Sequence, residues 1–490
     1  MVNNLKTVTP EELGFSSKCV ENFIDTMEKH KICLHSFMML RYNKVGAEGY
    51  WKPFDENTLH RMYSVSKTFV SAAIGMLADE GKISLNDKIV KYFPDKLPNG
   101  ELQPYIADTT IRDLLVMATP YSNVTYGLEF NDWAWTFFNT PTTHPSGTIF
   151  SYDTSGTYIL DVIVERVTGM PFLQYMRKGL FDHIGFSKDT WCIKAPEGYS
   201  WGGSGVMATT RDLAKFALVF LNGGKFNGKQ LISEDYIKAA TTKQIDNNTE
   251  GMNYLWSYGY GYQIWILDDG AFAFRGMGSQ LAICYPKKDF LFVCTGDTQG
   301  NTQAERMIFE TLWHEIIEKL SDELPADTKA YNSLIERCST LSLIPIQGED
   351  KSKILESING VTYTLKDNPM QISKLSVNIN GDEGVLNYTN PRGDKKLHFG
   401  IKKYVECGFP ETHYFGDTIN KPLNRMYRAT SCAAWTEAQK LVIRSFIIDD
   451  HLGNLTITLS FKGNQIGVYM HKTAEFFLNE YEGFAGGYIE

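Results

Sequence analysis

The stretch YSVSKTFVSAAIGMLADEGK, residues 63–82, decides the fold that we expect for this chain. The apolar residues after Lys67 recur at steps of three and four, which predicts an amphipathic helix with Gly81 just past its end. Residues 64–67 spell SxxK at the start of this helix. Because residues three apart share a helix face, the Lys67 side chain should lie beside that of Ser64.

This serine and lysine are suited to nucleophilic catalysis. A serine hydroxyl is a weak nucleophile until a neighbouring base removes its proton. Lys67 can be that base only when it is neutral, and burial against the apolar helix face would disfavour its charged form. Unpaired backbone N–H groups at the helix start could stabilise an oxyanion. The alternative is a serine N-cap followed by a solvated lysine, since SxxK alone is common; the strand-to-helix context favours catalysis.

Length and composition are those of an ordinary globular protein. The 490 residues allow two or three domains, and 43% hydrophobic with 21% charged residues is typical of a soluble chain. A net charge of −9 without clustered Lys or Arg argues against nucleic acid as a partner. No apolar run approaches the roughly 18 residues of a membrane span, so we expect no membrane partner either.

The N-terminus and the cysteines indicate the compartment. No apolar run follows the single early lysine of MVNNLKTVTPEELGF, so this segment does not resemble a secretory signal, and we expect a cytoplasmic protein. The eight cysteines are scattered without CxxC pairs, which favours buried reduced thiols over disulfides or a zinc site. We therefore expect no metal and no cofactor.

The order of predicted elements indicates the domain organisation. Over residues 1–320 we expect an opening helix, a strand hairpin, several middle helices, then consecutive strands and a final helix. The expected strands are 35–42, 49–51, 258–266, 271–274, 281–285 and 290–295. They predict an α+β domain with one antiparallel sheet, flanked by the terminal helices and carrying the middle helices as an inserted subdomain.

The composition changes after residue 320. Residues 321–355 begin with a polar, helix-breaking segment and are expected to be a linker. Residues 356–490 contain alternating runs such as KLSVNI, KLHFGI and NLTITLSF, separated by NGDEG, GDK and GN turns. This pattern predicts an all-β domain, either a small barrel of the lipocalin-like kind or a sandwich, with a structural, lid or assembly role.

A lysine-assisted serine mechanism needs a further proton carrier near the nucleophile. A tyrosine close to a cation is a good candidate, because the cation stabilises phenolate. The literal triplet YSN at residues 121–123 follows a helix in a loop, and we interpret it as a decoy. Tyr152 in SGTIFSYDTSGTYIL lies between a turn and a helix, where its direction can be fixed. Core packing is the alternative role for this tyrosine.

Several stretches together resemble the serine β-lactamase-related family of class C β-lactamases, DD-peptidases, and esterases and amidases of the same fold. They are YSVSKTF, DEGKISLNDKIVKYFPD, TIRDLLVM, SGTIFSYDTSGTYIL, VTGMPFLQYM, the GGSG turn with TTRDLAKF, and YGYGYQIW, in the family's order over residues 10–320. The resemblance implies that Ser64 is the acylated nucleophile, Lys67 its basic partner and Tyr152 the tyrosine of the second motif. Thr154 stands where Asn or Ser is usual and keeps only a hydroxyl.

The third motif of this family, KTG or HxG, corresponds to Phe274, Arg275 and Gly276. No lysine or histidine stands at position 274, which disfavours β-lactam recognition. Gly276 would let the backbone approach the substrate, and the N–H groups of Ser64 and Met277 are the expected oxyanion hole. Arg275 could anchor a substrate carboxylate through its bidentate geometry, or be a strand arginine that faces solvent.

These observations predict a serine hydrolase that acts through an acyl-enzyme on a small ester or amide. The resemblance implies that transfer of the acyl group to acceptors other than water is also open to it. One alternative is a true β-lactamase or D-peptidase. Another is a catalytically inactive binding protein of the same fold, which the altered second and third motifs suggest. The sequence does not fix the oligomeric state.

Overall fold

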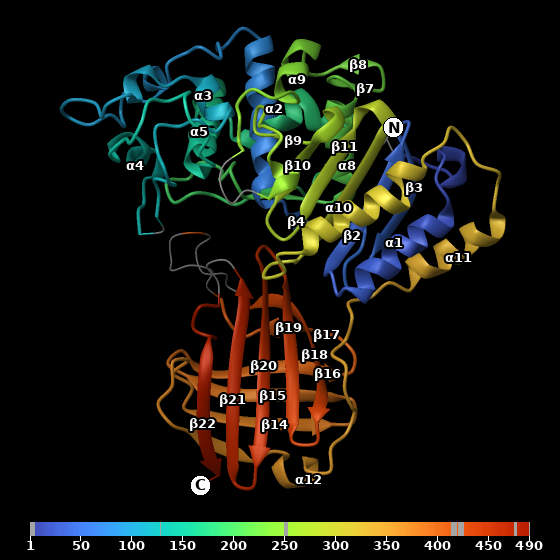
Figure 1. Ribbon diagram of the computed structural model, residues 1–490. Helices are drawn as coiled ribbons and strands as arrows, with labels where there is room; N and C mark the ends of the chain where they lie inside the picture. The colour runs from blue at the N-terminus through green and yellow to red at the C-terminus, as the bar shows by residue number, and fades with distance from the viewer. Residues whose placement is uncertain are drawn as a thin grey trace. The chain divides into compact units, whose positions relative to one another are not determined.

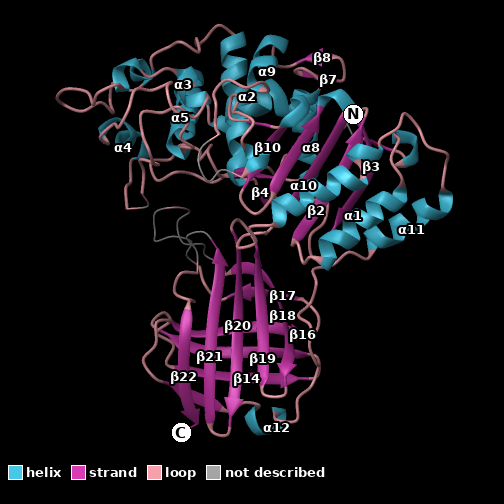
Figure 2. Cartoon of the chain, in the orientation of Figure 1, coloured by secondary structure: helices cyan, strands magenta, loops and turns pink. Residues whose placement is uncertain are grey.

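The computed structural model describes residues 5–127, 129–248, 253–412, 419, 426–474 and 478–489 (Figure 1). The chain divides into two compact units, Met1–Leu341 and Ser342–Glu490. The first unit combines helices with a mixed sheet, and the second is almost entirely β (Figure 2). The expected α+β fold followed by an all-β domain is therefore confirmed.

The first unit is built on a seven-stranded sheet, counted over the described residues, in the order β1-β3-β2-β12-β11-β10-β9. Neighbouring strands pair antiparallel, except that β1 runs parallel to β3. The strands are β1 (Lys6–Thr7), β2 (Leu34–Arg41), β3 (Lys44–Tyr50), β9 (Trp265–Ile266), β10 (Phe272–Gly276), β11 (Gln280–Tyr285) and β12 (Phe290–Gly296). The opening hairpin thus joins the later strands in one sheet, as the sequence predicts.

Helices cover both faces of this sheet, which is why β2 and β12 are buried along their whole length. Phe37 of β2 packs against Phe23 of α1 (Ser17–Lys29). The side chain of the preceding residue, Ser36, points to the other face and hydrogen bonds at 2.6 Å to Thr210, the first residue of α8. Helices α1, α10 and α11 therefore lie on one face, and α8 lies on the other (Figure 1).

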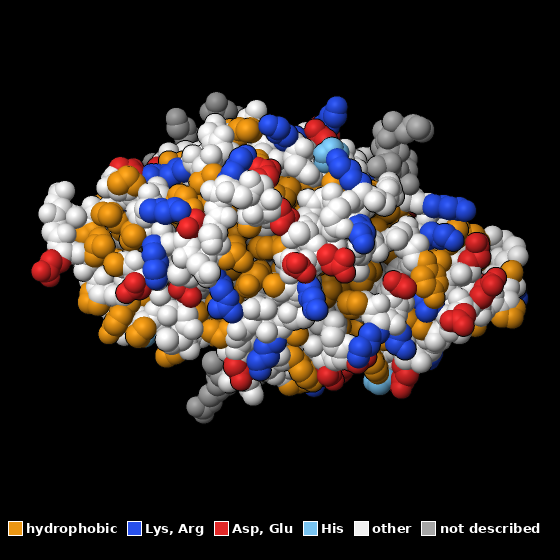
Figure 3. All heavy atoms as spheres, turned by 90° about the horizontal axis from the view of Figure 1, so that it is seen from above, with side chains coloured by type: hydrophobic (Ala, Val, Ile, Leu, Met, Phe, Trp, Pro, Cys, Tyr) orange, Lys and Arg blue, Asp and Glu red, His pale blue; other side chains and the backbone are white. Residues whose placement is uncertain are grey.

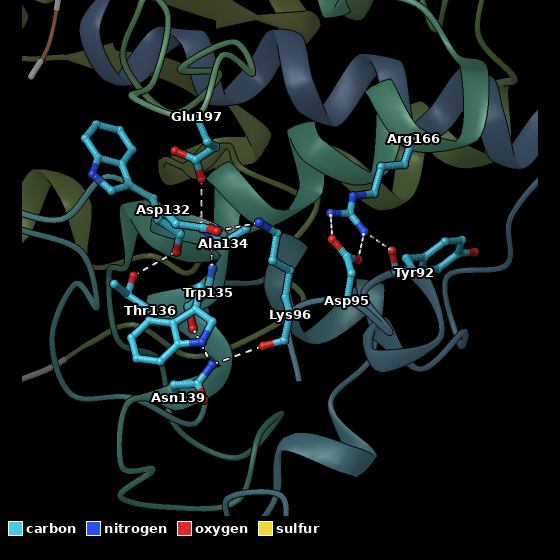
Figure 4. Close-up of polar contacts among 11 residues, drawn as sticks. Tyr92, Asp95, Lys96, Asp132, Ala134, Trp135, Thr136, Asn139, Arg166 and Glu197 are labelled. Atoms are coloured by element: carbon cyan, nitrogen blue, oxygen red, sulfur yellow. Dashed lines mark hydrogen bonds and ion pairs between the residues drawn. The ribbon is translucent and has the colours of Figure 1, made fainter. Parts of the chain in front are cut away.

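The expected inserted subdomain consists of the helices between β3 and β9. These helices are α2 (Ser66–Asp79), α3 (Ile111–Leu115), α4 (Trp133–Asn139), α5 (Thr154–Thr168), α6 (Phe172–Met176), α7 (Asp182–Ile184), α8 (Thr210–Leu221) and α9 (Glu234–Ala240). Polar contacts attach the loop around residues 92–96 to two of these helices (Figure 4). Arg166 of α5 pairs with Asp95, and Lys96 pairs with Asp132 at the start of α4.

Two small sheets complete the first unit. A three-stranded sheet has the order β4-β6-β5, and β7 and β8 form a short hairpin. The strands are β4 (His60–Arg61), β5 (Trp191–Cys192), β6 (Val206–Ala208), β7 (Lys225–Phe226) and β8 (Lys229–Gln230). The three-stranded sheet matters for function, because β4 leads directly into the SxxK segment.

The second unit is a closed antiparallel barrel. Among the described residues, its strands follow the order β16-β15-β14-β13-β22-β21-β20-β19-β18-β17; a further parallel pairing of β16 with β18 closes the ring, and β17 pairs with β18 beside it. Alternate residues point inward, so Leu455, Ile457 and Leu459 of β20 are buried. The elements are α12 (Leu355–Ile358), β13 (Thr362–Leu365), β14 (Lys374–Asn380), β15 (Glu383–Asn390), β16 (Gly393–Ile401), β17 (Val405–Phe409), β18 (Tyr427–Glu437), β19 (Lys440–Ile448), β20 (Leu452–Lys462), β21 (Gln465–Ala474) and β22 (Gly483–Ile489).

The boundary between the units differs from the predicted one. It lies between Leu341 and Ser342, so residues 321–355 are not a linker throughout. This segment contains α11 (Thr328–Ser339), in which Ser333 donates a hydrogen bond to Glu21 of α1 at 2.6 Å and Arg337 pairs with Glu28. Of the residues of α11, only Leu334 is buried, so the composition of this helix resembles that of a linker although it packs against α1.

Charged side chains of both signs are interspersed on the molecular face in Figure 3. In the described part of the chain, no helix is both long and apolar enough to cross a membrane. All eight cysteines are free thiols, and burial raises the pKa of several of them, including Cys284 and Cys294.

Two histidines are buried together beside β4. The ring of His35 stacks on Phe54 at 3.8 Å between centroids, and the ring of His60 lies 5.6 Å from that of His35. Burial lowers the pKa of His60 to about 4. Burial, together with the neighbouring His60, lowers the pKa of His35 well below its usual value. Both rings therefore stay neutral in the folded protein at pH values where the unfolded chain binds protons.

We expect this burial to make the protein acid-labile. A histidine whose pKa is depressed by folding stabilises the protein above the unfolded pKa, and this stability is lost as the pH falls. When the pH falls from about 7.5 to about 5.5, His35 alone should lower the free energy of unfolding by about 1.4 kcal/mol. Urea unfolding of wild type and His35→Leu at both pH values measures this loss as the difference between the two proteins. An equal pH dependence in both would contradict the expectation.

The comparison with the variant is needed because buried carboxyl groups act in the opposite direction. Burial raises the pKa of Asp161 well above its usual value, so its contribution to stability grows as the pH falls. This contribution is the same in wild type and His35→Leu, and it cancels when the two are subtracted.

Candidate active site

The three-stranded sheet delivers Ser64 to the N-terminus of α2. Strand β4 ends at Arg61, Met62 N–H donates to the Val206 carbonyl at 2.8 Å, and Tyr63–Val65 then form a 3₁₀ turn before α2 begins. Tyr63 has a φ of +46°, a conformation that bulky residues rarely adopt. Such strain is typical of functional sites, because only a well-packed surrounding can maintain it. Ser64, the middle residue of this turn, is partly exposed.

The structure brings Lys67 into direct contact with Ser64. Lys67 Nζ lies 2.9 Å from Ser64 Oγ and donates a second hydrogen bond to the Gly203 carbonyl oxygen at 2.7 Å. The residue is only 1% exposed. Both of these hydrogen-bond partners are uncharged oxygen atoms. The amine is thus held against the hydroxyl that it would have to deprotonate.

The loop of residues 201–205 supplies this carbonyl, and a buried arginine holds the loop. Arg61 Nε donates to the Ser204 carbonyl at 3.0 Å, and its Nη2 donates to Ser204 Oγ at 3.0 Å. The guanidinium lies between the rings of Tyr63, at 4.3 Å, and Trp201, at 4.7 Å. Arg61 therefore connects the strained residue before the nucleophile with the loop that orients Lys67.

Glycine is required in this loop because α5 passes so close to it. A Cβ atom at Gly203 would lie 2.6 Å from Cγ2 of Thr154, the first residue of α5. Thr154 therefore borders the loop that binds Lys67.

Tyr152 lies on the other side of Lys67. Lys67 Nζ is 5.1 Å from the centroid of the Tyr152 ring, which stacks on Trp265 at 5.6 Å and 23°. The next residue, Asp153, caps α5: its carboxylate accepts from Ser155 N–H at 2.8 Å and from Thr119 Oγ1 at 2.9 Å. Burial raises the pKa of Asp153, although these hydrogen bonds and the Lys67 charge act against that rise. The cap fixes the backbone that carries Tyr152.

The YSN triplet lies elsewhere. Tyr121 is buried, its ring packs against Phe137, and its hydroxyl donates to the Phe137 carbonyl. Burial, with the charge of Asp153, raises its pKa. Tyr121 is thus part of the core of the helical subdomain.

The end of β10 lies against the nucleophile. A Cβ atom at Gly276 would lie 2.4 Å from the Met62 carbonyl oxygen and 3.3 Å from Ser64 N. The turn that follows is held by Gln280, whose Nε2 donates to the Met277 carbonyl at 3.0 Å and to the Gly296 carbonyl at 2.7 Å. Because Gly276 has no side chain, β10 can approach Ser64 closely. Met277 is the residue that follows this close approach in the chain.

The other two residues of the third motif turn away from Ser64. Phe274 is fully buried and packs against Phe216 and Phe220 of α8, which makes it a core residue. Arg275 lies on the opposite face of β10 and is paired with Glu305 of α10 (Ala304–Glu315) at 2.9 Å. Its charge is thus balanced within the protein. This geometry does not favour either side chain as a direct contact for substrate.

Residues far apart in the chain therefore meet around one hydroxyl. The expected group of Ser64, Lys67 and Tyr152 lies together, with Gly276 beside it. The prediction from sequence missed Arg61 and the Gly203 carbonyl. A GGSG turn signals a close backbone approach, but nothing in it indicates that a carbonyl oxygen would bind Lys67.

Comparison with known proteins places this chain in a family. The family model described as Beta-lactamase matches residues 22–309. The chain is 25% identical over 322 residues to 6-aminohexanoate-dimer hydrolase from Paenarthrobacter ureafaciens. This alignment covers 62% of this chain and 76% of that protein. It is 22% identical over 325 residues to a protein of Salmonella agona named putative D-alanyl-D-alanine carboxypeptidase, covering 51% of this chain and 75% of the relative.

Solved structures agree on the fold. A putative 6-aminohexanoate-dimer hydrolase from Bacillus anthracis superposes with a TM-score of 0.53 at 20% identity, over 66% of this chain and 89% of that chain. SurE superposes with a TM-score of 0.50 at 16% identity, over 92% of this chain and 94% of its own. Together with the family model, which spans more than half of the sequence, these matches show that the chain belongs to the Beta-lactamase family and is related to hydrolases of that fold.

Proposed function

We propose that this protein is a serine hydrolase that cleaves a small ester or amide through an acyl-enzyme on Ser64. The observation that carries this proposal is the contact of 2.9 Å between Lys67 Nζ and Ser64 Oγ. Lys67 is buried, and the Gly203 carbonyl holds its nitrogen in place. A neutral amine in this position can accept the serine proton.

The reaction would proceed in two steps. Ser64 Oγ attacks the carbonyl carbon while its proton passes to the pair of Lys67 and Tyr152. The backbone N–H groups of Ser64 and Met277 would stabilise the oxyanion. The bond to the leaving group breaks, the leaving alcohol or amine takes up the proton, and Ser64 remains acylated. Water then repeats the attack and releases the carboxylic acid; an alcohol or amine in place of water would give acyl transfer.

Two features favour an ordinary ester or amide over a β-lactam. Phe274 contributes no cation, since it is an apolar residue buried against α8, and Arg275 is already paired with Glu305. In the described part of the third motif, no unpaired cation is thus left for the carboxylate of a β-lactam. A relative named for hydrolysis of the 6-aminohexanoate dimer supports a linear amide as one class of substrate to test.

The first prediction concerns the nucleophile. Wild type should hydrolyse short-chain p-nitrophenyl esters and show an acyl adduct on Ser64 by intact mass, whereas Ser64→Ala should lose both. The expected loss of kcat/KM is about 10⁴-fold or more, because a catalytic unit fails as a whole when one member is removed. The linear 6-aminohexanoate dimer serves as the amide substrate in a parallel assay.

The outcomes separate the candidate functions. Equal turnover by both proteins would reject Ser64 as the nucleophile. Absence of turnover, together with no adduct from a serine-directed phosphonate, would favour the inactive binding protein. Rapid turnover of nitrocefin with little turnover of esters would favour the β-lactamase alternative.

The second prediction concerns the oxyanion hole. In Gly276→Ala the new methyl group would lie 2.4 Å from the Met62 carbonyl, so the end of β10 must move away from Ser64. Since loss of one oxyanion donor costs on the order of 10²- to 10³-fold in kcat, we expect a loss of that size. The matched control is Gly100→Ala, because a Cβ atom at Gly100 meets no heavy atom within 4 Å. Similar kcat values for both variants would argue against Met277 as a donor.

A further inference from the structure

An ion pair behind Tyr152 has no part in the reaction described above. Arg275 Nε lies 3.0 Å from both carboxylate oxygens of Glu305, and its Nη2 lies 2.9 Å from Glu305 Oε2. The carboxylate thus accepts hydrogen bonds from the planar guanidinium with both of its oxygens. Such two-oxygen pairing of arginine with a carboxylate fixes the relative orientation of the two groups. With its side chain 34% exposed, Arg275 is only partly shielded from solvent.

Two tryptophans enclose this pair. The Arg275 guanidinium lies 4.6 Å from the ring centroid of Trp256 and 5.4 Å from that of Trp265. Trp256 also donates from Nε1 to Glu305 Oε2 at 3.0 Å, so the carboxylate binds both the arginine and one of the rings. A guanidinium over an aromatic face is attracted by the ring quadrupole. The pair and the two rings therefore restrain one another.

Trp265 connects this cluster to the active site. On one side of the cluster, the Trp265 ring stacks on the Tyr152 ring, with 5.6 Å between the centroids and 23° between the ring planes. Trp265 belongs to the two-residue edge strand β9, which pairs with β10 and also forms a single bridge between Trp265 and Tyr260. Ala273 of β10 is its partner, so Arg275, two residues further on, is a diagonal neighbour on the same face. The Trp265 ring also packs against Tyr260 at 5.1 Å and Trp256 at 5.6 Å, and the Arg275 guanidinium adds a cationic contact to this aromatic packing.

We propose that Arg275 is a positioning residue for catalysis. Held by Glu305, it fixes the ring of Trp265, and Trp265 in turn fixes the direction of the Tyr152 ring beside Lys67. The inference rests on the proposed acyl-enzyme function. It replaces the expected role of Arg275 as an anchor for a substrate carboxylate, because the guanidinium is already paired with Glu305 and lies over the rings of the two tryptophans.

The kinetic test separates positioning from substrate binding. Arg275→Gln and Glu305→Gln should lower kcat about 10- to 100-fold with little change in KM, as expected when a reacting group is misplaced. Arg275→Lys keeps the charge but loses the planar stack and the two-oxygen pairing, so it should restore little activity. The matched control is Arg306→Gln, on the same helix as Glu305, where the wild-type arginine makes an exposed pair with Glu310 at 3.8 Å. A rise in KM confined to substrates with a carboxylate would overturn the proposal in favour of an anchor.

A double-mutant cycle tests whether the effect passes through Trp265. If it does, Arg275→Gln should cost less than about twofold in kcat when it is introduced into Trp265→Leu, although it costs much more in wild type. Thermal midpoints of all variants are recorded, so that the rates are compared only where the proteins are folded. Multiplicative losses in the double variant would mean that the two residues act independently, which would overturn the proposal.

A measurement that does not need activity keeps the two proposals separable. In protein labelled with 3-fluorotyrosine, the ¹⁹F resonance of Tyr152 is assigned by its absence in Tyr152→Phe. We expect this resonance to shift or broaden in Arg275→Gln and to stay unchanged in Arg306→Gln. An unchanged resonance in Arg275→Gln would overturn the positioning role. If Ser64→Ala retains the wild-type rate, the proposed function fails, and the resonance still reports whether Arg275 holds Tyr152.

Discussion

The structure of the site depends on one hydrogen-bonded nitrogen. Lys67 Nζ lies between Ser64 Oγ and the Gly203 carbonyl, and this bridge joins the start of α2 to a loop 136 residues further along the chain. A buried amine needs partners, because an unsatisfied polar group is costly away from water. The carbonyl satisfies the amine without adding a formal charge. The same contact therefore satisfies the buried amine and holds it against Ser64 Oγ.

The surrounding layers act on this nitrogen and its neighbours through rigid contacts. Arg61 ties the loop of residues 201–205 to the strained turn at Tyr63. The buried cap at Asp153 fixes the backbone on the Tyr152 side, and the aromatic cluster around Arg275 restrains the Tyr152 ring. Large aromatic rings and charged groups with several hydrogen bonds have few alternative arrangements when packed together. Such a surrounding is suited to holding the reacting groups within the narrow geometry that catalysis requires.

Local patterns predicted the elements well where the signal came from neighbouring residues. The helix predicted from the spacing of apolar residues after Lys67 is α2, Ser66–Asp79, and Gly81 lies just past its end. The stretch 258–266 was predicted to be one strand, and this was wrong for most of its length: β9 covers only Trp265–Ile266. Gln263 has a φ of +61°, and its amide nitrogen donates to the Leu114 and Leu115 carbonyls of α3. These long-range contacts override the strand propensity of the surrounding aromatic residues.

The sequence by itself determined the pairing of a serine with a lysine three residues later, the tyrosine before a helix, the mixed fold of the first unit and the β character of the second. These features depend on periodicity and spacing over a few residues, which a sequence displays directly. Only the tertiary structure decided that Gly203 binds Lys67, that Arg61 holds the loop, that Phe274 is core and that Arg275 pairs with Glu305. Each of these joins segments far apart in the chain, and their partners are backbone carbonyls or common residue types. No local pattern marks such a partner, because the fold alone brings the two segments together.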